Sequence, residues 1–314
     1  MPDFDAVITG GGIVGSSTAL CLAQHGYRIL LVDSRVPQPV GRSDGLNTRT
    51  VALSPGSTNF LGRLEALKDV CRGSIKRIRV WEREGTATIV FDADEIGAKD
   101  LAVVVEVEAL VESLWTNLVN CVEVEAPSTV DAVKHSRDAV ELVIDKRVVS
   151  TACLVVAEGR RSATLKQLGI AVQNYGTVGG AIGTVASTAN PHNGCAQQRF
   201  GDGILALLPL HDERRVSVVW SLRPERRDQL LMLDGETFAA ALTHESESVF
   251  GEVTEVGERV GFPIGQSLVS DFNPMPRVLV IGDAARALHP LAGQGVNLGL
   301  EDVQGIEAVA RHLK

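Results

Sequence analysis

The sequence has no long hydrophobic run, no cluster of basic residues and no leader pattern. No apolar run in the 314 residues reaches the about eighteen that a membrane-spanning helix needs. The Met1–Asp5 segment carries no basic stretch, so we expect no signal peptide. A net charge of −9 without Lys/Arg blocks disfavours a nucleic-acid binder and docking on an anionic membrane. These absences predict a cytoplasmic protein, at most peripheral to the inner membrane, with no nucleic-acid partner.

Cysteine is scarce and scattered. The five cysteines are odd in number and never form a C-x-x-C pair. Such spacing argues against a disulfide framework or a zinc site and favours reduced, structural thiols, so we expect no metal. These cysteines are Cys21, Cys71, Cys121, Cys153 and Cys195.

The hydrophobic pattern at the N-terminus is that of an α/β protein. The apolar runs Ala6–Ile8 and Tyr27–Val32 flank a helix-compatible segment, Ile13–His25. Continuous apolar strands separated by a helix predict a parallel sheet that is covered on both faces. A final buried strand over Val278–Ile281 and a helix from about Gly293–Val296 to the end follow the same pattern.

The middle of the chain alternates instead. Arg77–Glu82 and Thr86–Val90 predict an antiparallel hairpin, and Ile204–Leu208 with Val216–Trp220 predict a second strand pair. We also expect helices near 58–70 and over 107–119. The length favours about two domains. We therefore predict two interleaved domains: a nucleotide-binding domain over 1–75, 98–175 and 265–314, and an antiparallel-sheet domain over 76–97 and 176–264.

A dinucleotide fingerprint lies between the first strand and the first helix. Gly10 permits a tight turn, Gly12 admits a pyrophosphate and Gly15 lets helix and strand pack closely. Asp33 ends the second strand, where a carboxylate accepts ribose hydroxyls. The context of strand, helix and acid makes this pattern specific for a dinucleotide.

A second glycine-containing segment follows the last strand. Gly282 and Asp283 close that strand, and Asp283 is suited to a polyol hydroxyl. Gly293 and Gly295 at a helix start let backbone N–H groups approach a flat, electron-rich ring. This second segment favours a flavin over a nicotinamide as the bound dinucleotide.

Together these segments resemble the flavoprotein aromatic hydroxylases (class A FAD-dependent monooxygenases), most closely the ubiquinone-biosynthesis hydroxylase family. The matching segments are 49–54 (RTVALS), 198–200 (QRF), 205–210 (LALLPL) and 289–302 (HPLAGQGVNLGLED). The resemblance covers nearly the whole chain. It implies a para-hydroxybenzoate-hydroxylase-like fold, a Rossmann-like FAD-binding domain interleaved with a substrate-binding sheet.

The resemblance also implies an activity. Such enzymes hold one FAD, reduce it with NADPH or NADH, and transfer oxygen from a flavin C4a-hydroperoxide to a phenol ring. The implied substrates are a polyprenylated phenol and molecular oxygen, and other ubiquinone-biosynthesis proteins are possible partners. By matching position, the candidate catalytic residues are His289, Pro290 and Gly293, with His289 either an acid–base group or a packing residue of its loop. The candidate cofactor-binding residues are Gly10, Gly12, Gly15, Asp33, Arg49, Glu158, Gly282, Asp283, Pro290, Gly293, Gly295, Val296 and Asn297.

The sequence departs from the family pattern at three positions. Glu158 replaces a common Asp, Arg286 stands where His is common, and Val107 stands where Asn is common. Family members also commonly continue beyond the position of Lys314, so the chain resembles a shortened member. Two alternatives stay open: a catalytically impaired scaffold subunit of a biosynthetic complex, or another flavin oxidoreductase of this fold, such as a reductase of prenyl chains.

Overall fold

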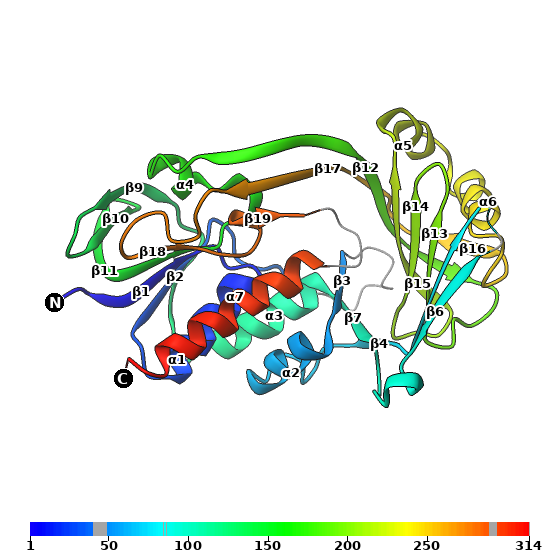
Figure 1. The fold of residues 1–314 in the computed structure, drawn as a ribbon. Helices are drawn as coiled ribbons and strands as arrows, with labels where there is room; N and C mark the ends of the chain where they lie inside the picture. The colour runs from blue at the N-terminus through cyan, green and yellow to red at the C-terminus, as the bar shows by residue number, and fades with distance from the viewer. Residues whose placement is uncertain (40–48, 84, 86, 289–293, 314) are drawn as a thin grey trace.

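The computed structural model describes residues 1–39, 49–83, 85, 87–288 and 294–313. Within these residues the strands form three sheets, which we call the first, the large and the small sheet. Among the described residues, no helix combines the length and apolar composition that a membrane crossing requires. Figure 1 shows the first sheet at one end of the molecule, the large sheet at the other and the small sheet between them.

The first sheet confirms the parallel βαβ unit. The strand β1 pairs in parallel with β2 on one side and with β11 on the other, and β18 pairs in parallel with β11. The strand order is β8-β2-β1-β11-β10-β9, with β18 beside β11. Its strands are β1 (Phe4–Thr9), β2 (Ile29–Val32), β8 (Glu123–Glu125), β9 (Val130–His135), β10 (Val140–Ile144), β11 (Arg147–Val156) and β18 (Val278–Val280).

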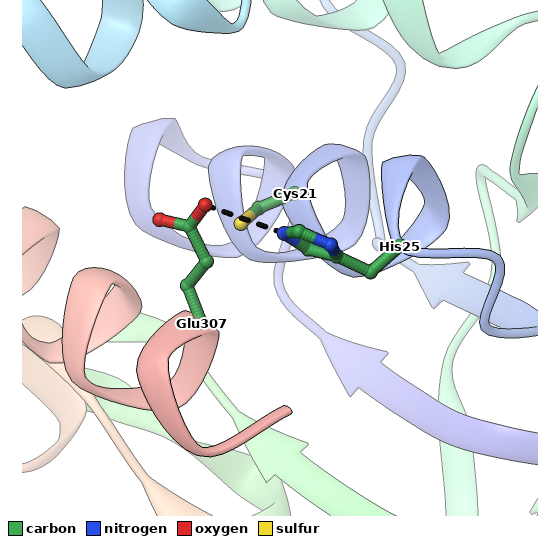
Figure 2. Close-up of side chains that lie close together, drawn as sticks. All are labelled: Cys21, His25 and Glu307. Carbon is green, nitrogen blue, oxygen red and sulfur yellow. Dashed lines mark hydrogen bonds and ion pairs between the residues drawn. The ribbon is translucent and has the colours of Figure 1, made fainter. Parts of the chain in front are cut away.

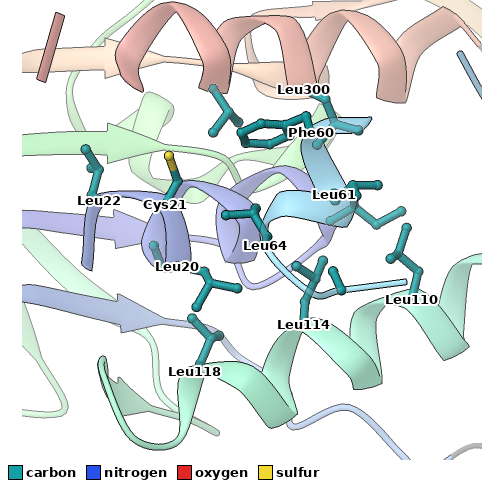
Figure 3. Close-up of a cluster of buried hydrophobic side chains, with 14 of the residues drawn as sticks. Leu20, Cys21, Leu22, Phe60, Leu61, Leu64, Leu110, Leu114, Leu118 and Leu300 are labelled. Carbon is teal, nitrogen blue, oxygen red and sulfur yellow. The ribbon is translucent and has the colours of Figure 1, made fainter. Parts of the chain in front are cut away.

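Four helices pack together against one side of the first sheet. In α3 the side chains of Leu110, Leu114 and Leu118 repeat every four residues and are fully buried, so one helix face points into the core. Figure 3 shows these leucines facing Leu20 and Leu64, with Phe60 farther up in the same cluster beside Leu300. The helices are α1 (Ile13–Gln24), α2 (Pro55–Arg63), α3 (Val107–Leu118) and α7 (Gln294–Ala310).

The helix expected near 58–70 begins and ends earlier. Pro55 occupies the first turn of α2, where its missing N–H costs nothing, and the Ser54 hydroxyl accepts a hydrogen bond from the Ser57 N–H. The helix stops at Arg63, and Glu65 adopts a positive φ of 57°. A cap and a proline therefore fix the start better than the apolar pattern does.

The large sheet carries the predicted antiparallel strands. Its order is β19-β17-β12-β15-β14-β13-β5-β6, with β16 beside β12. The predicted hairpin is present as β5 and β6, and β13 joins β5 in parallel across more than a hundred residues of chain. The strands are β5 (Arg77–Glu82), β6 (Thr88–Asp92), β12 (Val172–Thr188), β13 (Cys195–Phe200), β14 (Ile204–Pro209), β15 (Arg215–Leu222), β16 (Val253–Val256), β17 (Val260–Val269) and β19 (Arg286–Ala287).

The long strands β12 and β17 connect the two ends of the molecule. Figure 1 shows both running from beside the first sheet to the large sheet. The small sheet lies between, in the order β3-β7-β4. The predicted division into domains stays a prediction. The remaining elements are β3 (Thr50–Leu53), β4 (Arg72–Ile75), β7 (Ala102–Glu106), α4 (Ala163–Gln167), α5 (Pro224–Leu231), α6 (Gly235–Glu245) and the short 3₁₀ turns η1 (Asp94–Ile96), η2 (Gly159–Arg161) and η3 (Gly282–Ala284).

Candidate functional site

The turn between β1 and α1 leaves room for glycine alone at two of its three fingerprint positions. Gly10 has φ +101°, and a Cβ there would lie 2.4 Å from the carbonyl oxygen of Ala157. A Cβ on Gly15 would lie 1.8 Å from the Gly10 carbonyl oxygen. Gly12 differs, because its Cβ would meet no described atom within 4 Å. Gly10 and Gly15 thus permit the turn itself, whereas Gly12 leaves open space above it.

Gly11 is held from three directions, which fixes this turn. Its N–H donates to the Asp33 carboxylate at 2.5 Å. Its carbonyl accepts from the Trp115 indole Nε1 at 2.7 Å and from the Ser16 hydroxyl at 2.8 Å. Trp115 comes from α3 and was not among the residues that the sequence pattern singled out. A lone tryptophan in a helical segment carried no signal for this role.

Asp33 follows the last residue of β2, as the fingerprint requires. Its second carboxylate oxygen accepts from the Arg35 N–H at 2.8 Å. Each oxygen keeps a further lone pair, so the carboxylate can still accept hydrogen bonds from a ligand. Asp33 therefore both secures the glycine turn and stays available to a ribose.

The C-terminal segment packs directly on this turn. A Cβ on Gly299 would lie 2.5 Å from a methyl group of Val14, and one on Gly282 would lie 3.3 Å from Val14. Gly282 itself has φ +58°, a conformation that favours glycine. The side chain of Val14 thus joins the start of α1 to both η3 and α7, although these segments are far apart in the sequence.

Asp283 lies beside the start of α7. A Cβ on Gly295 would be 3.2 Å from Asp283 Oδ1. Loss of hydration raises the pKa of Asp283, although the positive charges of Arg160, Arg49 and Arg286 oppose the shift. Because its side chain is accessible yet surrounded by protein atoms, Asp283 is placed to accept a hydrogen bond from a bound hydroxyl.

Arg286, a departure from the family pattern, forms an ion pair with Asp302. Its guanidinium donates to both carboxylate oxygens, at 3.1 and 2.9 Å, and to the Leu298 carbonyl at 3.0 Å. Asp302 also accepts from the Gly282 N–H at 3.0 Å. The pair thereby ties β19 to α7 and holds the turn that presents Asp283.

Asn297 joins α7 to the small sheet. Its amide donates to the Ala52 carbonyl and accepts from the Ser54 N–H, both at 2.8 Å. Its neighbour Val296 packs against the helical core. The structure therefore gives Asn297 a positioning contact with β3 and places the start of α7 against that strand.

Glu158 is engaged within its own segment. Its carboxylate accepts from the Ser162 hydroxyl at 2.5 Å, and from the Thr164 N–H and hydroxyl at 3.0 and 2.6 Å. These bonds satisfy donors at the start of α4.

Val107, the third departure, begins α3 and donates its N–H to the Arg49 carbonyl at 2.8 Å. Three of the predicted residues, His289, Pro290 and Gly293, lie outside the described residues.

The described residues fit an extended FAD. The ligand needs space over Gly12, an acid at the end of β2 and an uncapped helix start, and no described side chain caps α1. Gly10, Gly12 and Gly15 belong to the turn that Asp33 holds, and Gly282, which contacts Val14, brings Asp283 and Gly295 to the same region. The roles of the individual residues stay predictions.

Cys21, His25 and Glu307 form a separate cluster (Figure 2), with possible ligand atoms within 4.8 Å of one another. Arg63 donates to both oxygens of Glu307, at 3.1 and 2.9 Å, and Arg311 donates as well. Burial raises the pKa of Cys21 to about 12. A neutral thiol beside two guanidinium groups suits an ion-pair cluster better than a metal ion.

Comparisons with known proteins agree with this geometry. The model of the family described as "FAD binding domain" matches residues 3–307. The chain is 32% identical to 3-demethoxyubiquinol 3-hydroxylase of Escherichia coli, over 96% of this chain and 78% of that protein. It is 30% identical to ubiquinone hydroxylase UbiL of Rhodospirillum rubrum, over 95% and 70% of the two chains.

Solved structures share the fold. A crystal structure of PqsL from Pseudomonas aeruginosa in complex with 2-aminobenzoylacetate has a TM-score of 0.80 at 22% identity, covering 98% of this chain and 86% of that one. The p-nitrophenol 4-monooxygenase PnpA from Pseudomonas putida DLL-E4 has a TM-score of 0.76 at 17% identity, covering 98% and 79%. At such identities the likeness establishes the fold alone, which is the one expected from the sequence.

Proposed function

Because the chain belongs to the FAD-binding family that includes the ubiquinone-biosynthesis hydroxylases, we propose that it hydroxylates the aromatic ring of a polyprenylated phenol in ubiquinone biosynthesis. FAD is the cofactor, NADPH or NADH is the electron donor, and molecular oxygen is the second substrate. The proposal includes a cytoplasmic location, at most peripheral to the inner membrane, where a prenylated phenol partitions.

The observation that carries the proposal is the contact of Val14 with both Gly282 and Gly299. This contact brings the fingerprint turn and the start of α7 together. An extended dinucleotide lying across Val14 would then have its phosphates at the start of α1 and its flavin ring at the start of α7. The same two regions carry most of the residues that the family resemblance assigns to FAD.

The chain's own residues bind and orient this cofactor. Asp33 accepts hydrogen bonds from the ribose hydroxyls, and Asp283 accepts one from a hydroxyl of the ribityl chain. Arg49 and Arg160, whose charges act on Asp283, offset the negative charge of the pyrophosphate. The backbone N–H groups at the start of α7, near Gly295, point a positive dipole end at the ring.

The FAD that these residues would hold would supply hydride acceptance from the nicotinamide and activation of oxygen. The residues around it position the phenol ring and exclude water from the reacting atoms. Asn297 would hold the start of α7 against β3 beside the cofactor.

Two measurements test the proposal. Adding FAD to the purified chain is expected to give a yellow protein with a shifted, resolved flavin band. A prenylated phenol is then expected to stimulate NADPH or NADH oxidation and to yield a product that has gained one oxygen.

A flavin-loaded protein that neither nicotinamide reduces would refute the monooxygenase. A product that gains hydrogens would indicate a reductase of prenyl chains instead. A folded protein that stays colourless in FAD would favour a scaffold role.

A further inference from the structure

The two faces of the large sheet differ in what covers them. On one face, Leu207, Val218 and Trp220 are buried against Phe238 and other residues of α5 and α6. The rings of Trp220 and Phe238 meet edge to face with centroids 6.1 Å apart. Figure 1 shows α5 and α6 at the end of the molecule remote from the first sheet. The other face therefore looks toward the FAD-binding half.

The small sheet covers only part of that other face. Ala52, Ile75 and Val104 pack there against Ala196, with Leu208 at the margin. Farther along the strands the apolar side chains are half-buried or exposed. We call this uncovered part of the face the open face: Val80, Ile89, Phe91, Gln198, Phe200, Ile204, Ala206 and Val219.

Strand register places these residues on one surface. Ile89 lies opposite Val80, and Phe91 lies opposite Ile78. The side chains of each pair therefore lie on the same face of the sheet. Phe200 lies opposite Ile204 in the same way. The exposed fractions are 57% for Ile89, 52% for Phe91 and 37% for Phe200. Ile89 and Phe91 thus stand in solvent two residues apart on β6, and Phe200 stands on the same face two strands away.

The open face suits an extended apolar chain. From β15 to β6 it crosses four strand spacings, roughly 19 Å, which exceeds one aromatic ring. Among these residues Gln198 alone is polar, and Glu82, opposite Phe200, and Ser221, opposite Ile204, border them on the same face. A polar or charged ligand lying inside this border would therefore lose hydration with little compensation.

The small sheet links the candidate flavin site to the sheet face that carries the open face. Ala52, whose carbonyl accepts from Asn297, packs its side chain against the covered part of the same sheet face. A ring held beside the start of α7 would therefore have an apolar substituent running out over the large sheet.

We propose that Ile89, Phe91 and Phe200 bind the polyisoprenoid tail of the substrate. This inference rests on the proposed function, and it gives a role to Gln198, Phe200 and Ala206 of the family-like segments 198–200 and 205–210, whereas Leu205 and Leu207 pack against the helices on the other face. The competing occupant is a second copy of the chain pairing along the free edge of β6. Two copies that each carry a net charge of −9 repel each other, which favours the tail.

The test uses farnesol, a tail without a ring, as the probe. Calorimetric titration is expected to show binding to the full chain and a loss of about tenfold or more in affinity for the double variant Ile89→Ser/Phe91→Ser. The control is Val90→Ser, which changes a residue of the same strand, 46% exposed, on the opposite face. Circular dichroism checks that each variant folds.

Each outcome decides the inference. Equal farnesol affinity in wild type and double variant, an equal loss in Val90→Ser, or no farnesol binding at all would overturn it. Sedimentation that shows a dimer dissociated by the double variant would assign the surface to a second copy. Flavin reduction by NADPH or NADH is measured separately, so the monooxygenase can hold while the tail surface fails.

Discussion

Arg286 and Asp302 are joined by two hydrogen bonds, and Asp302 also holds the backbone N–H of Gly282. A residue that departs from the family pattern is thus built into the turn that presents Asp283. Both side chains are less than one-fifth exposed. The ion pair is enough to explain why an arginine stands at this position, and no role in the reaction is needed to explain it.

We predict that Arg286→Met lowers the free energy of unfolding by about 2–3 kcal/mol, because Asp302 is left half-buried without its cation. Urea denaturation measures this loss. The matched control is Arg28→Met, which removes an exposed ion pair with Asp5 at 3.8 Å and is expected to cost no more than about 1 kcal/mol. Equal losses in the two variants would contradict the structural role of the buried pair.

Gly12→Ala separates folding from cofactor binding. Gly12 has ordinary extended backbone angles, φ −71° and ψ −176°, and a methyl group there meets no described atom within 4 Å. Stability should therefore change by less than about 0.5 kcal/mol. Affinity for FAD should fall about tenfold or more, because the methyl group occupies the approach of the pyrophosphate. Flavin fluorescence titration measures this fall.

The contrasting variant is Gly15→Ala. Its Cβ would overlap the Gly10 carbonyl oxygen, so urea denaturation should show a strongly destabilised protein. If Gly12→Ala binds FAD as tightly as wild type, the pyrophosphate does not lie over this turn.

Trp115→Phe tests the indole hydrogen bond to the Gly11 carbonyl. That carbonyl keeps its bond from Ser16, so it is not left unpaired. We expect a loss of about 1 kcal/mol, which appears as a severalfold weaker affinity for FAD. Trp81→Phe, in the large sheet, serves as the control and should leave FAD affinity unchanged. Equal FAD affinity in Trp115→Phe and wild type would show that the turn keeps its shape without this bond.

Lowering the pH should reduce the free energy of unfolding, because the Glu307 carboxylate becomes protonated. Hydrogen bonds from Arg63, with those of Arg311 and His25, lower the pKa of Glu307 from 4.5 to about 2. A carboxyl whose pKa is lower in the folded state stabilises the protein above pH 4.5 and loses that contribution as the pH falls toward 2. Wild type should therefore lose about 2 kcal/mol more than Glu307→Gln across this range. Unfolding measured at a series of pH values tests it, and parallel pH profiles would refute it.

Local sequence patterns predicted individual helices and strands, whereas the pairing of strands far apart in the sequence could not be predicted from them. Alternation at Arg77–Glu82 and the apolar spacing of Val107–Leu118 gave strand and helix because each signal lies within a few residues. The parallel pairing of β5 with β13 has no such local signal. Helices α5 and α6 were missed, because their sequences are short and their helical periodicity is weak.

The candidate site likewise contains residues with a local sequence signal and residues without one. The turn geometry at Gly10, Gly15 and Asp33 was predictable because one turn and one strand end dictate their types, and their role toward the cofactor stays a prediction. Trp115 was not predictable, because its partner Gly11 is distant in sequence and any helical tryptophan packs somewhere. The capping bonds of Glu158 lie within six residues, whereas its assignment to the cofactor comes from the sequence resemblance and stays a prediction.

The contacts of Val14 with Gly282 and Gly299 join segments about 270 residues or more apart in the sequence. Because closing a loop of this length costs more entropy than forming a local turn, we expect these contacts to form late in folding. Strand β18 must likewise insert beside β11 before the first sheet is complete. FAD binding would then report that the N-terminal turn and the start of α7 have come together. Visible flavin colour would therefore serve as a quality check on refolding that secondary-structure spectroscopy cannot provide.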